Sequence, residues 1–132
     1  MGWWNDEEEP FADQWKCIQE ALKDPEYGEG IIWLMGDFNS QADVRGEGYD
    51  LVLKSGWKDT YLLAEEKDDG ITVAEEIDGW REEDGRSGST KNEKRLDYIF
   101  CNTPADVRSS NVICNGKNAP VVSDHYGVMI TV

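Results

Sequence analysis

Three short segments of this sequence place acidic, amide and imidazole side chains next to apolar runs. They are residues 36–40 (GDFNS), 95–100 (RLDYIF) and 123–128 (SDHYGV), and the third contains His125, the only histidine in the chain. Proteins that alternate helices and strands commonly build their sites from polar residues at strand ends. We therefore expect the three segments to contribute to one site.

These residue types suit the hydrolysis of a phosphate ester. That reaction needs a hard divalent cation on oxygen ligands, an oriented water molecule, and positive charge where the phosphoryl oxygens gain charge. Asp37 can orient or deprotonate the water, and the side-chain amide of Asn39 can donate to a phosphoryl oxygen. Asp97 can accept a hydrogen bond from His125, which fixes the imidazole tautomer and raises its pKa. Asp124 supplies a carboxylate for the cation.

Each segment taken singly has an ordinary structural explanation. Asp37 and Asn39 suit a turn, and Asp97 suits a hydrogen-bonded carboxylate on an edge strand. His125 suits a core or surface position. The combination of the three segments is what favours a catalytic site.

The first half of the chain predicts two helices and a strand. Apolar side chains at helical spacing predict a helix, namely Phe11, Trp15, Ile18 and Leu22. Pro10 suits its first position, and Pro25 ends the pattern. The apolar run Ile31–Met35 is typical of a strand buried on both faces. A short helix is expected around Tyr49–Lys54, ended by Ser55 and Gly56.

The second half predicts a long loop followed by strands. Residues 64–94 are polar and interrupted by glycine, which indicates a functional loop with a short element at Ile71–Val73. Strands are expected at Arg95–Cys101, Val107–Cys114 and Tyr126–Val132, with a turn at residues 115–116.

Length and composition limit the classes of protein. The chain has 132 residues, which indicates one domain, and 13 basic and 28 acidic residues, for a net charge of −15. So acidic a surface disfavours a nucleic-acid partner. No apolar run approaches the ~20 residues of a membrane span. No signal-peptide pattern is present, and three cysteines without a CxxC motif predict neither a disulfide framework nor a thiolate zinc site. These features predict a cytoplasmic protein.

The three segments, in this order and spacing, resemble the C-terminal motifs of the endonuclease/exonuclease/phosphatase superfamily of deoxyribonuclease I-like phosphoesterases. The resemblance implies an α/β (α+β) fold, the C-terminal half of a two-sheet β-sandwich flanked by helices. It gives Asp37 and Asn39 the water-orienting and phosphate-binding places, and Asp97 and His125 the family's Asp–His pair. Asp124 matches the acidic residue before that histidine, which is often a metal ligand. The implied cofactor is Mg²⁺, with Mn²⁺ as an alternative.

Residues 2–7 (GWWNDE) and 77–81 (IDGWR) resemble a bacterial branch that contains maltose 6'-phosphate phosphatase and sphingomyelinase-like enzymes. The favoured substrate is then a sugar phosphate monoester, which suits a chain of net charge −15 better than DNA does. The expected substrate-binding residues are Trp3, Trp4, Trp80, Arg86 and Lys94. The tryptophans suit stacking on a sugar or packing at the core, and the basic residues suit phosphate binding or a solvated loop.

The resemblance also implies that residues 1–132 form a single partial domain. In the family, the N-terminal half supplies a metal-binding Glu, an Asn near the metal and a second catalytic His. Half of a two-sheet sandwich exposes an apolar face, so self-association or marginal stability is expected. Three functions stay open: a metal-dependent phosphoesterase, a nuclease or phosphodiesterase acting on DNA or a phospholipid head group, and a catalytically incomplete fragment.

Overall fold

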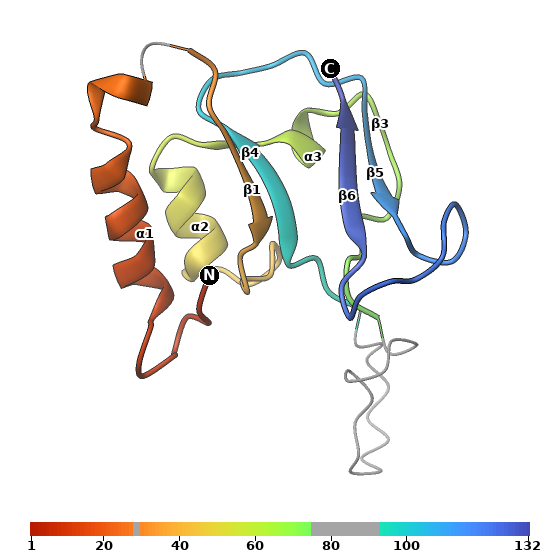
Figure 1. The fold of residues 1–132 in the computed structure, drawn as a ribbon, viewed down its shortest axis with the longest axis horizontal. Helices are drawn as coiled ribbons and strands as arrows, with labels where there is room; N and C mark the ends of the chain where they lie inside the picture. The colour runs from red at the N-terminus through yellow and green to blue at the C-terminus, as the bar shows by residue number, and fades with distance from the viewer. Residues whose placement is uncertain (28–29, 75–92) are drawn as a thin grey trace.

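The computed structural model describes residues 1–27, 30–74 and 93–132 (Figure 1). Two of the expected substrate-binding residues, Trp80 and Arg86, lie outside these ranges, as does the motif at 77–81. The helices are α1 (Phe11–Ala21), η1 (Pro25–Tyr27, a 3₁₀ turn), α2 (Gly48–Lys54) and α3 (Thr60–Leu63). The strands are β1 (Trp33–Asp37), β2 (Lys58–Asp59), β3 (Glu66–Lys67), β4 (Asp97–Cys101), β5 (Ser109–Ile113) and β6 (Gly127–Thr131).

The described strands form two small sheets. The first sheet has the order β1-β4-β2, with both neighbours antiparallel to β4. The second has the order β3-β5-β6, in which β3 runs parallel and β6 antiparallel to β5. In Figure 1, α1 and α2 lie on one side of the first sheet and the second sheet lies on its other side. This arrangement of helices and two sheets confirms the predicted fold class.

An aromatic core joins the helices to the first sheet. Phe38 contacts Phe100 with ring centroids 4.9 Å apart and Tyr98 with centroids 5.9 Å apart. Phe11 of α1 also packs against Phe38, with ring centroids 6.5 Å apart. Because side chains alternate along a strand, Tyr98 and Phe100 share the helix-facing side of β4. The core therefore fixes the ends of β1 and β4 relative to each other.

The helices of the first half agree with their sequence patterns, with one small correction. Phe11 and Trp15 are buried in α1, and α2 covers the range expected for the second helix. Pro10 occupies the N-cap with an extended backbone instead of the first helical position. It still favours the helix start, since its fixed φ and missing N–H suit that end.

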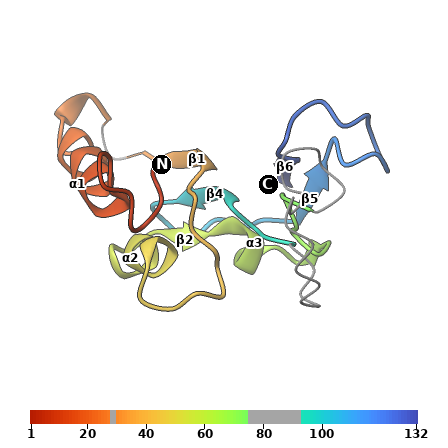
Figure 2. The ribbon, with the colours of Figure 1, turned by 90° about the horizontal axis from the view of Figure 1, so that it is seen from below.

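The strand predicted at Ile31–Met35 differs more from expectation. It lies at Trp33–Asp37, and Met35 is 65% exposed, so it is not buried on both faces. The physical reason is its place in the sheet. Among the described residues, β1 pairs with β4 alone and forms an edge of the first sheet (Figure 2).

The second half contains the three predicted strands, each a little shorter than its apolar pattern. The two-residue strands β2 and β3 and the four-residue helix α3 are not predicted from the sequence. Elements this short contain too little pattern to be recognised. The segment expected as a loop contains β3 and a bridge between Val73 and Lys94. Among the described residues, no helix has both the length and the apolar character needed to cross a membrane.

Candidate active site

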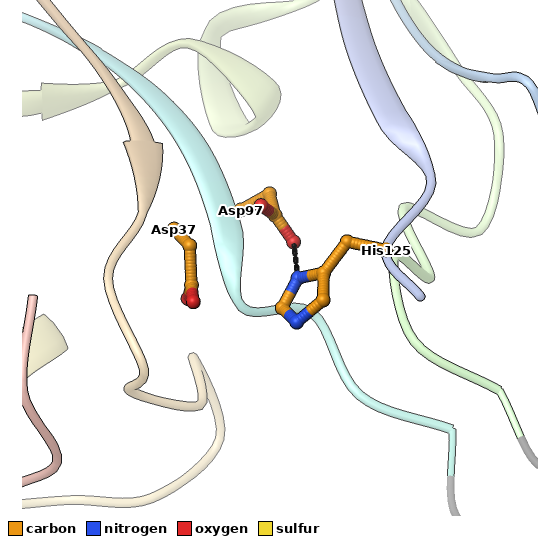
Figure 3. A group of neighbouring side chains, drawn as sticks. All are labelled: Asp37, Asp97 and His125. Atoms are coloured by element: carbon orange, nitrogen blue, oxygen red, sulfur yellow. Dashed lines mark hydrogen bonds and ion pairs between the residues drawn. The ribbon is translucent and has the colours of Figure 1, made fainter. Parts of the chain in front are cut away.

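Antiparallel pairing of β1 with β4 brings two of the predicted carboxylates together. The register places Asp37, the last residue of β1, opposite Asp97, the first residue of β4. Directly opposed residues of an antiparallel pair project to the same face, with Cβ atoms about 4.5–5.5 Å apart. Residues that are 60 positions apart in sequence therefore meet at one end of the first sheet (Figure 3).

The turn after β1 is fixed by hydrogen bonds and by a buried ring. The backbone N–H of Asn39 donates to Oδ1 of Asp37 at 2.7 Å, and that of Phe38 donates to the carbonyl of Leu96 at 2.8 Å. Asn39 has a φ of 45°, which asparagine tolerates better than most residues. Its Nδ2 donates to the carbonyl of Met1 at 2.7 Å. An amide nitrogen carries two hydrogens, so this contact uses one of them.

His125, two residues before β6, contacts one of these two carboxylates. Its Nδ1 lies 2.7 Å from Oδ2 of Asp97. A carboxylate accepts and does not donate, so Nδ1 carries the proton of this bond. The side chains are 18% and 17% exposed, respectively. The ring's other nitrogen, Nε2, points away from Asp97 (Figure 3).

Thr72, which the sequence motifs do not include, links the strand ends that carry these residues. Its Oγ1 accepts hydrogen bonds from the backbone N–H groups of Leu96, at 3.0 Å, and Asp97, at 3.3 Å. Its carbonyl accepts from the backbone N–H of Tyr126 at 2.7 Å. Thr72 is fully buried. It therefore holds the start of β4 beside the residue that follows His125, and a lone threonine in a polar segment gives no sequence signal of this.

The charges of the site influence one another. Burial works against the charged form of His125, but the hydrogen bond and charge of Asp97 outweigh it and raise the pKa of His125 above its usual value. Burial chiefly raises the pKa of Asp37, and the nearby charge of Asp97 adds to the rise, whereas the N–H of Asn39 opposes it. The site thus favours a protonated imidazole beside a carboxyl of increased basicity.

Among the described residues, Asp37, Asp97 and His125 also form a group whose ligand atoms lie within 4.8 Å of one another. Two carboxylates offer the oxygen donors that Mg²⁺ and Mn²⁺ prefer. Asp124, the predicted metal ligand, is exposed and outside this group, and its Oδ1 lies 3.2 Å from the hydroxyl of Ser123. The chemistry of the donor set therefore fits a divalent cation at Asp37 and Asp97.

The surroundings of the other three predicted substrate-binding residues, Trp3, Trp4 and Lys94, differ from one another. Trp3 is 41% exposed. Trp4 packs against Phe11, with ring centroids 6.4 Å apart, and so contributes to the edge of the aromatic core. Lys94 pairs through its backbone with Val73, next to Thr72. The structure brings the catalytic candidates Asp37, Asp97 and His125 together.

No family model and no curated protein matches the sequence. Solved structures do match. An endonuclease/exonuclease/phosphatase family protein from Leptotrichia buccalis is 37% identical, with a TM-score of 0.76, and the match covers 100% of this chain and 45% of that one. A mannosyl-6-phosphatase from Bacteroides thetaiotaomicron is 21% identical, with a TM-score of 0.64, over 92% of this chain and 45% of that one.

A protein from Bacteroides thetaiotaomicron that is described only as a member of the endonuclease/exonuclease/phosphatase family is 22% identical, with a TM-score of 0.61, over 91% of this chain and 44% of that one. This chain thus spans less than half the length of the solved chains that it matches. The similarity to the C-terminal half of these proteins confirms the resemblance that the three sequence segments predicted.

Proposed function

Because the chain is part of an endonuclease/exonuclease/phosphatase family fold, we propose that it carries one half of a phosphoesterase site. The observation that supports this most is the Asp97–His125 contact of 2.7 Å with Asp37 opposite Asp97. In the proposed reaction, Asp37 orients the attacking water and accepts a proton from it. His125, kept protonated by Asp97, donates from Nε2 to a phosphoryl oxygen.

Asn39 contributes the second hydrogen of its amide to another phosphoryl oxygen. A divalent cation, when bound, would neutralise charge on the phosphate, and Asp37 and Asp97 are the described carboxylates that fit it. Asp124 stays a proposed ligand of that cation. A cytoplasmic location also stays a proposal.

A sugar phosphate monoester is the favoured substrate. The net charge of −15 disfavours a long polyanion such as DNA more than a small ester. One structural neighbour is described as a mannosyl-6-phosphatase, which agrees with this choice. Trp3, Trp4, Trp80, Arg86 and Lys94 are the residues proposed to contact the sugar or its phosphate.

Phosphate release from a panel of sugar phosphates with Mg²⁺ tests the function. We expect His125→Ala to lower kcat/KM by about 100-fold or more, the usual contribution of a positioned proton donor. Val122→Ala is the matched control, since Val122 lies near His125 in sequence and is 78% exposed. Chelation of the cation should stop the reaction in the unsubstituted chain.

Equal release by the unsubstituted chain and by His125→Ala would contradict the proposed role. Cleavage of plasmid DNA that weakens steeply with salt would favour the nuclease alternative. No turnover on any substrate would favour the incomplete-fragment alternative, in which the other half of the domain is needed.

A further inference from the structure

A buried ion pair lies beside the site, outside the contacts described so far. Nη2 of Arg95 lies 2.8 Å from Oδ2 of Asp59, and the two side chains are 12% and 1% exposed, respectively. Taking two charges out of water is costly, and replacing a buried pair by apolar residues is often neutral or stabilising. A role in orientation therefore accounts for this pair better than a gain in stability does.

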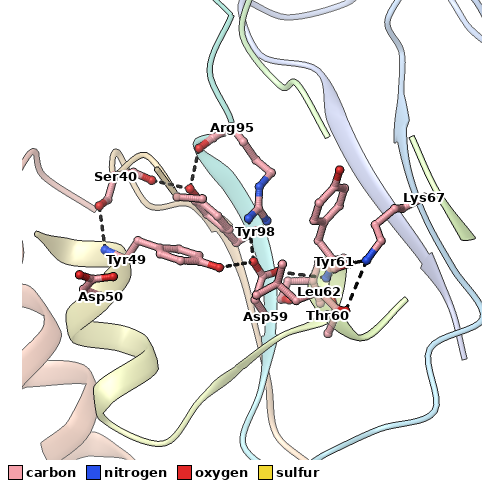
Figure 4. A network of polar contacts seen from close by, with 12 residues as sticks. Ser40, Tyr49, Asp50, Asp59, Thr60, Tyr61, Leu62, Lys67, Arg95 and Tyr98 are labelled. Carbon is pink, nitrogen blue, oxygen red and sulfur yellow. Dashed lines mark hydrogen bonds and ion pairs between the residues drawn. The ribbon is translucent and has the colours of Figure 1, made fainter. Parts of the chain in front are cut away.

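Asp59 is held by three elements at once (Figure 4). It ends β2 and caps α3, where its Oδ1 accepts from the backbone N–H of Tyr61 at 3.0 Å. Its Oδ2 accepts from the hydroxyl of Tyr49, in α2, at 2.7 Å. With both oxygens engaged, this carboxylate has little freedom to move, so it is a fixed anchor for the guanidinium of Arg95.

The guanidinium of Arg95 is also enclosed by aromatic rings. Its central carbon lies 4.5 Å from the ring centroid of Tyr61, 4.7 Å from that of Tyr98 and 5.6 Å from that of Tyr49. These distances are within the range of cation–π attraction. The planar group is therefore restrained on its faces as well as at its edge.

Gly70 makes room for this packing. It has a φ of +71°, and a Cβ there would lie 2.8 Å from Cε2 of Tyr61 and 3.0 Å from Cδ of Arg95. A side chain at this position would push the ring and the arginine apart. The local backbone is thus adapted to the arginine.

One phenol connects the backbones of the two segments that carry the carboxylates of the site. The hydroxyl of Tyr98 lies 2.6 Å from the carbonyl of Arg95 and 2.5 Å from that of Ser40. Arg95 is two residues before Asp97, and Ser40 is three residues after Asp37. The hydroxyl of Ser40 in turn accepts from the backbone N–H of Tyr49 at 2.8 Å.

We propose that the Asp59–Arg95 pair positions the carboxylate of Asp97, and through it the imidazole of His125. The inference concerns the same site and rests on the role proposed above for the Asp97–His125 pair. Arg95 fixes the chain two residues before Asp97. Oγ1 of Thr72 accepts hydrogen bonds from the backbone N–H groups of the next two residues, Leu96 and Asp97. Asp59 and Arg95 are positioning residues, since they act on the reacting groups only through Asp97.

The test uses the single histidine of the whole 132-residue chain as a probe. Nitrogen-15 NMR follows the proton on Nδ1 of His125 at one fixed pH and low temperature, without cation or substrate. In Arg95→Lys and Arg95→Met we expect this proton to exchange with water about tenfold faster or more, because the bond to Asp97 is weakened. Arg95→Lys keeps the charge but loses the planar fork.

Arg45→Met is the matched control. Arg45 also pairs with a carboxylate, Asp50, at 2.8 Å, and also lies over the ring of Tyr49, at 5.8 Å, but its side chain is 63% exposed. The exchange rate of the Nδ1 proton should not change in this variant. Tyr98→Phe, which removes only the hydroxyl between Arg95 and Ser40, should act like Arg95→Lys.

A purely structural pair would lower the melting temperature and leave the Nδ1 proton of the folded chain unchanged, and that result would overturn the proposal. Should Arg95→Met not fold, Arg95→Lys and Tyr98→Phe decide the matter by the same measurement. The readout requires no turnover. Faster exchange in the Arg95 variants, together with no phosphatase activity of the unsubstituted chain, would support the positioning role and contradict the proposed reaction. Unchanged exchange in these variants, together with activity of the unsubstituted chain, would contradict the positioning role and support the proposed reaction.

Discussion

His125 is the single histidine of the chain, and its Nδ1 donates a hydrogen bond to Oδ2 of Asp97 at 2.7 Å. The bond fixes the proton on Nδ1 and directs Nε2 away from Asp97, toward the place where a substrate oxygen is proposed to lie. A neutral partner in place of Asp97 would keep the shape of the contact but remove the charge. This difference gives a prediction about pH.

In Asp97→Asn, the pKa of His125 should fall, because the charge-assisted bond that raises it is lost. A raised pKa in the folded chain means that protonated His125 stabilises the fold below its ordinary pKa of about 6.5. That stabilisation disappears as the pH rises through the raised value. Melting curves should therefore depend on pH in this window for the unsubstituted chain and less for Asp97→Asn.

Proton NMR of the imidazole Cε1–H, with chelator present, measures the pKa directly. His125→Gln serves as the control for the melting curves, since it removes the titrating group. An unchanged pKa of His125 in Asp97→Asn would mean that the contact contributes no charge stabilisation.

At the scale of elements, the site depends on how the ends of β1, β4 and β6 are held together. The β1–β4 register sets Asp37 opposite Asp97, and Thr72 connects the start of β4 to the residue before β6. The aromatic core, in which Phe38 packs against Phe11 and Phe100, resists sliding of the strands. The strand ends thus form one unit.

Thr72→Val tests this link. It leaves the backbone N–H groups of Leu96 and Asp97 buried without their acceptor, and we expect a loss of about 1–3 kcal/mol in the free energy of unfolding. Thr72→Ser retains the hydroxyl and should lose much less. Urea unfolding followed by tryptophan fluorescence gives both values, and equal stability of the two variants would exclude the link.

At the scale of the whole molecule, an acidic surface coexists with edge strands that pair on one side only among the described strands. The net charge is −15, while Met35 on the edge strand β1 is 65% exposed and Met129 on the edge strand β6 is 48% exposed. Unpaired edges and exposed apolar side chains are templates for association. The charge opposes association, and salt weakens that opposition.

We therefore expect the isolated chain to self-associate, or to be only marginally stable, with association increasing at high salt. Sedimentation velocity over a range of protein and salt concentrations, with calorimetry, measures both. Met35→Lys should reduce association, whereas Leu62→Lys, on an exposed residue of α3, should have less effect. A monomer at every concentration, with a sharp melting transition at high temperature, would contradict this expectation.

The sequence by itself determined the parts of this protein that depend on local pattern. Helical spacing from Phe11 to Leu22 predicted α1, alternation predicted β6, and three short motifs predicted the family and named Asp37, Asp97 and His125. Tertiary structure alone decided which strands pair, that β1 lies at an edge, and that Thr72, Asp59 and Arg95 hold the site. Thr72 and Leu96 are 24 positions apart, Asp59 and Arg95 are 36 apart, and Asp37 and Asp97 are 60 apart, and no short-range pattern encodes such pairings.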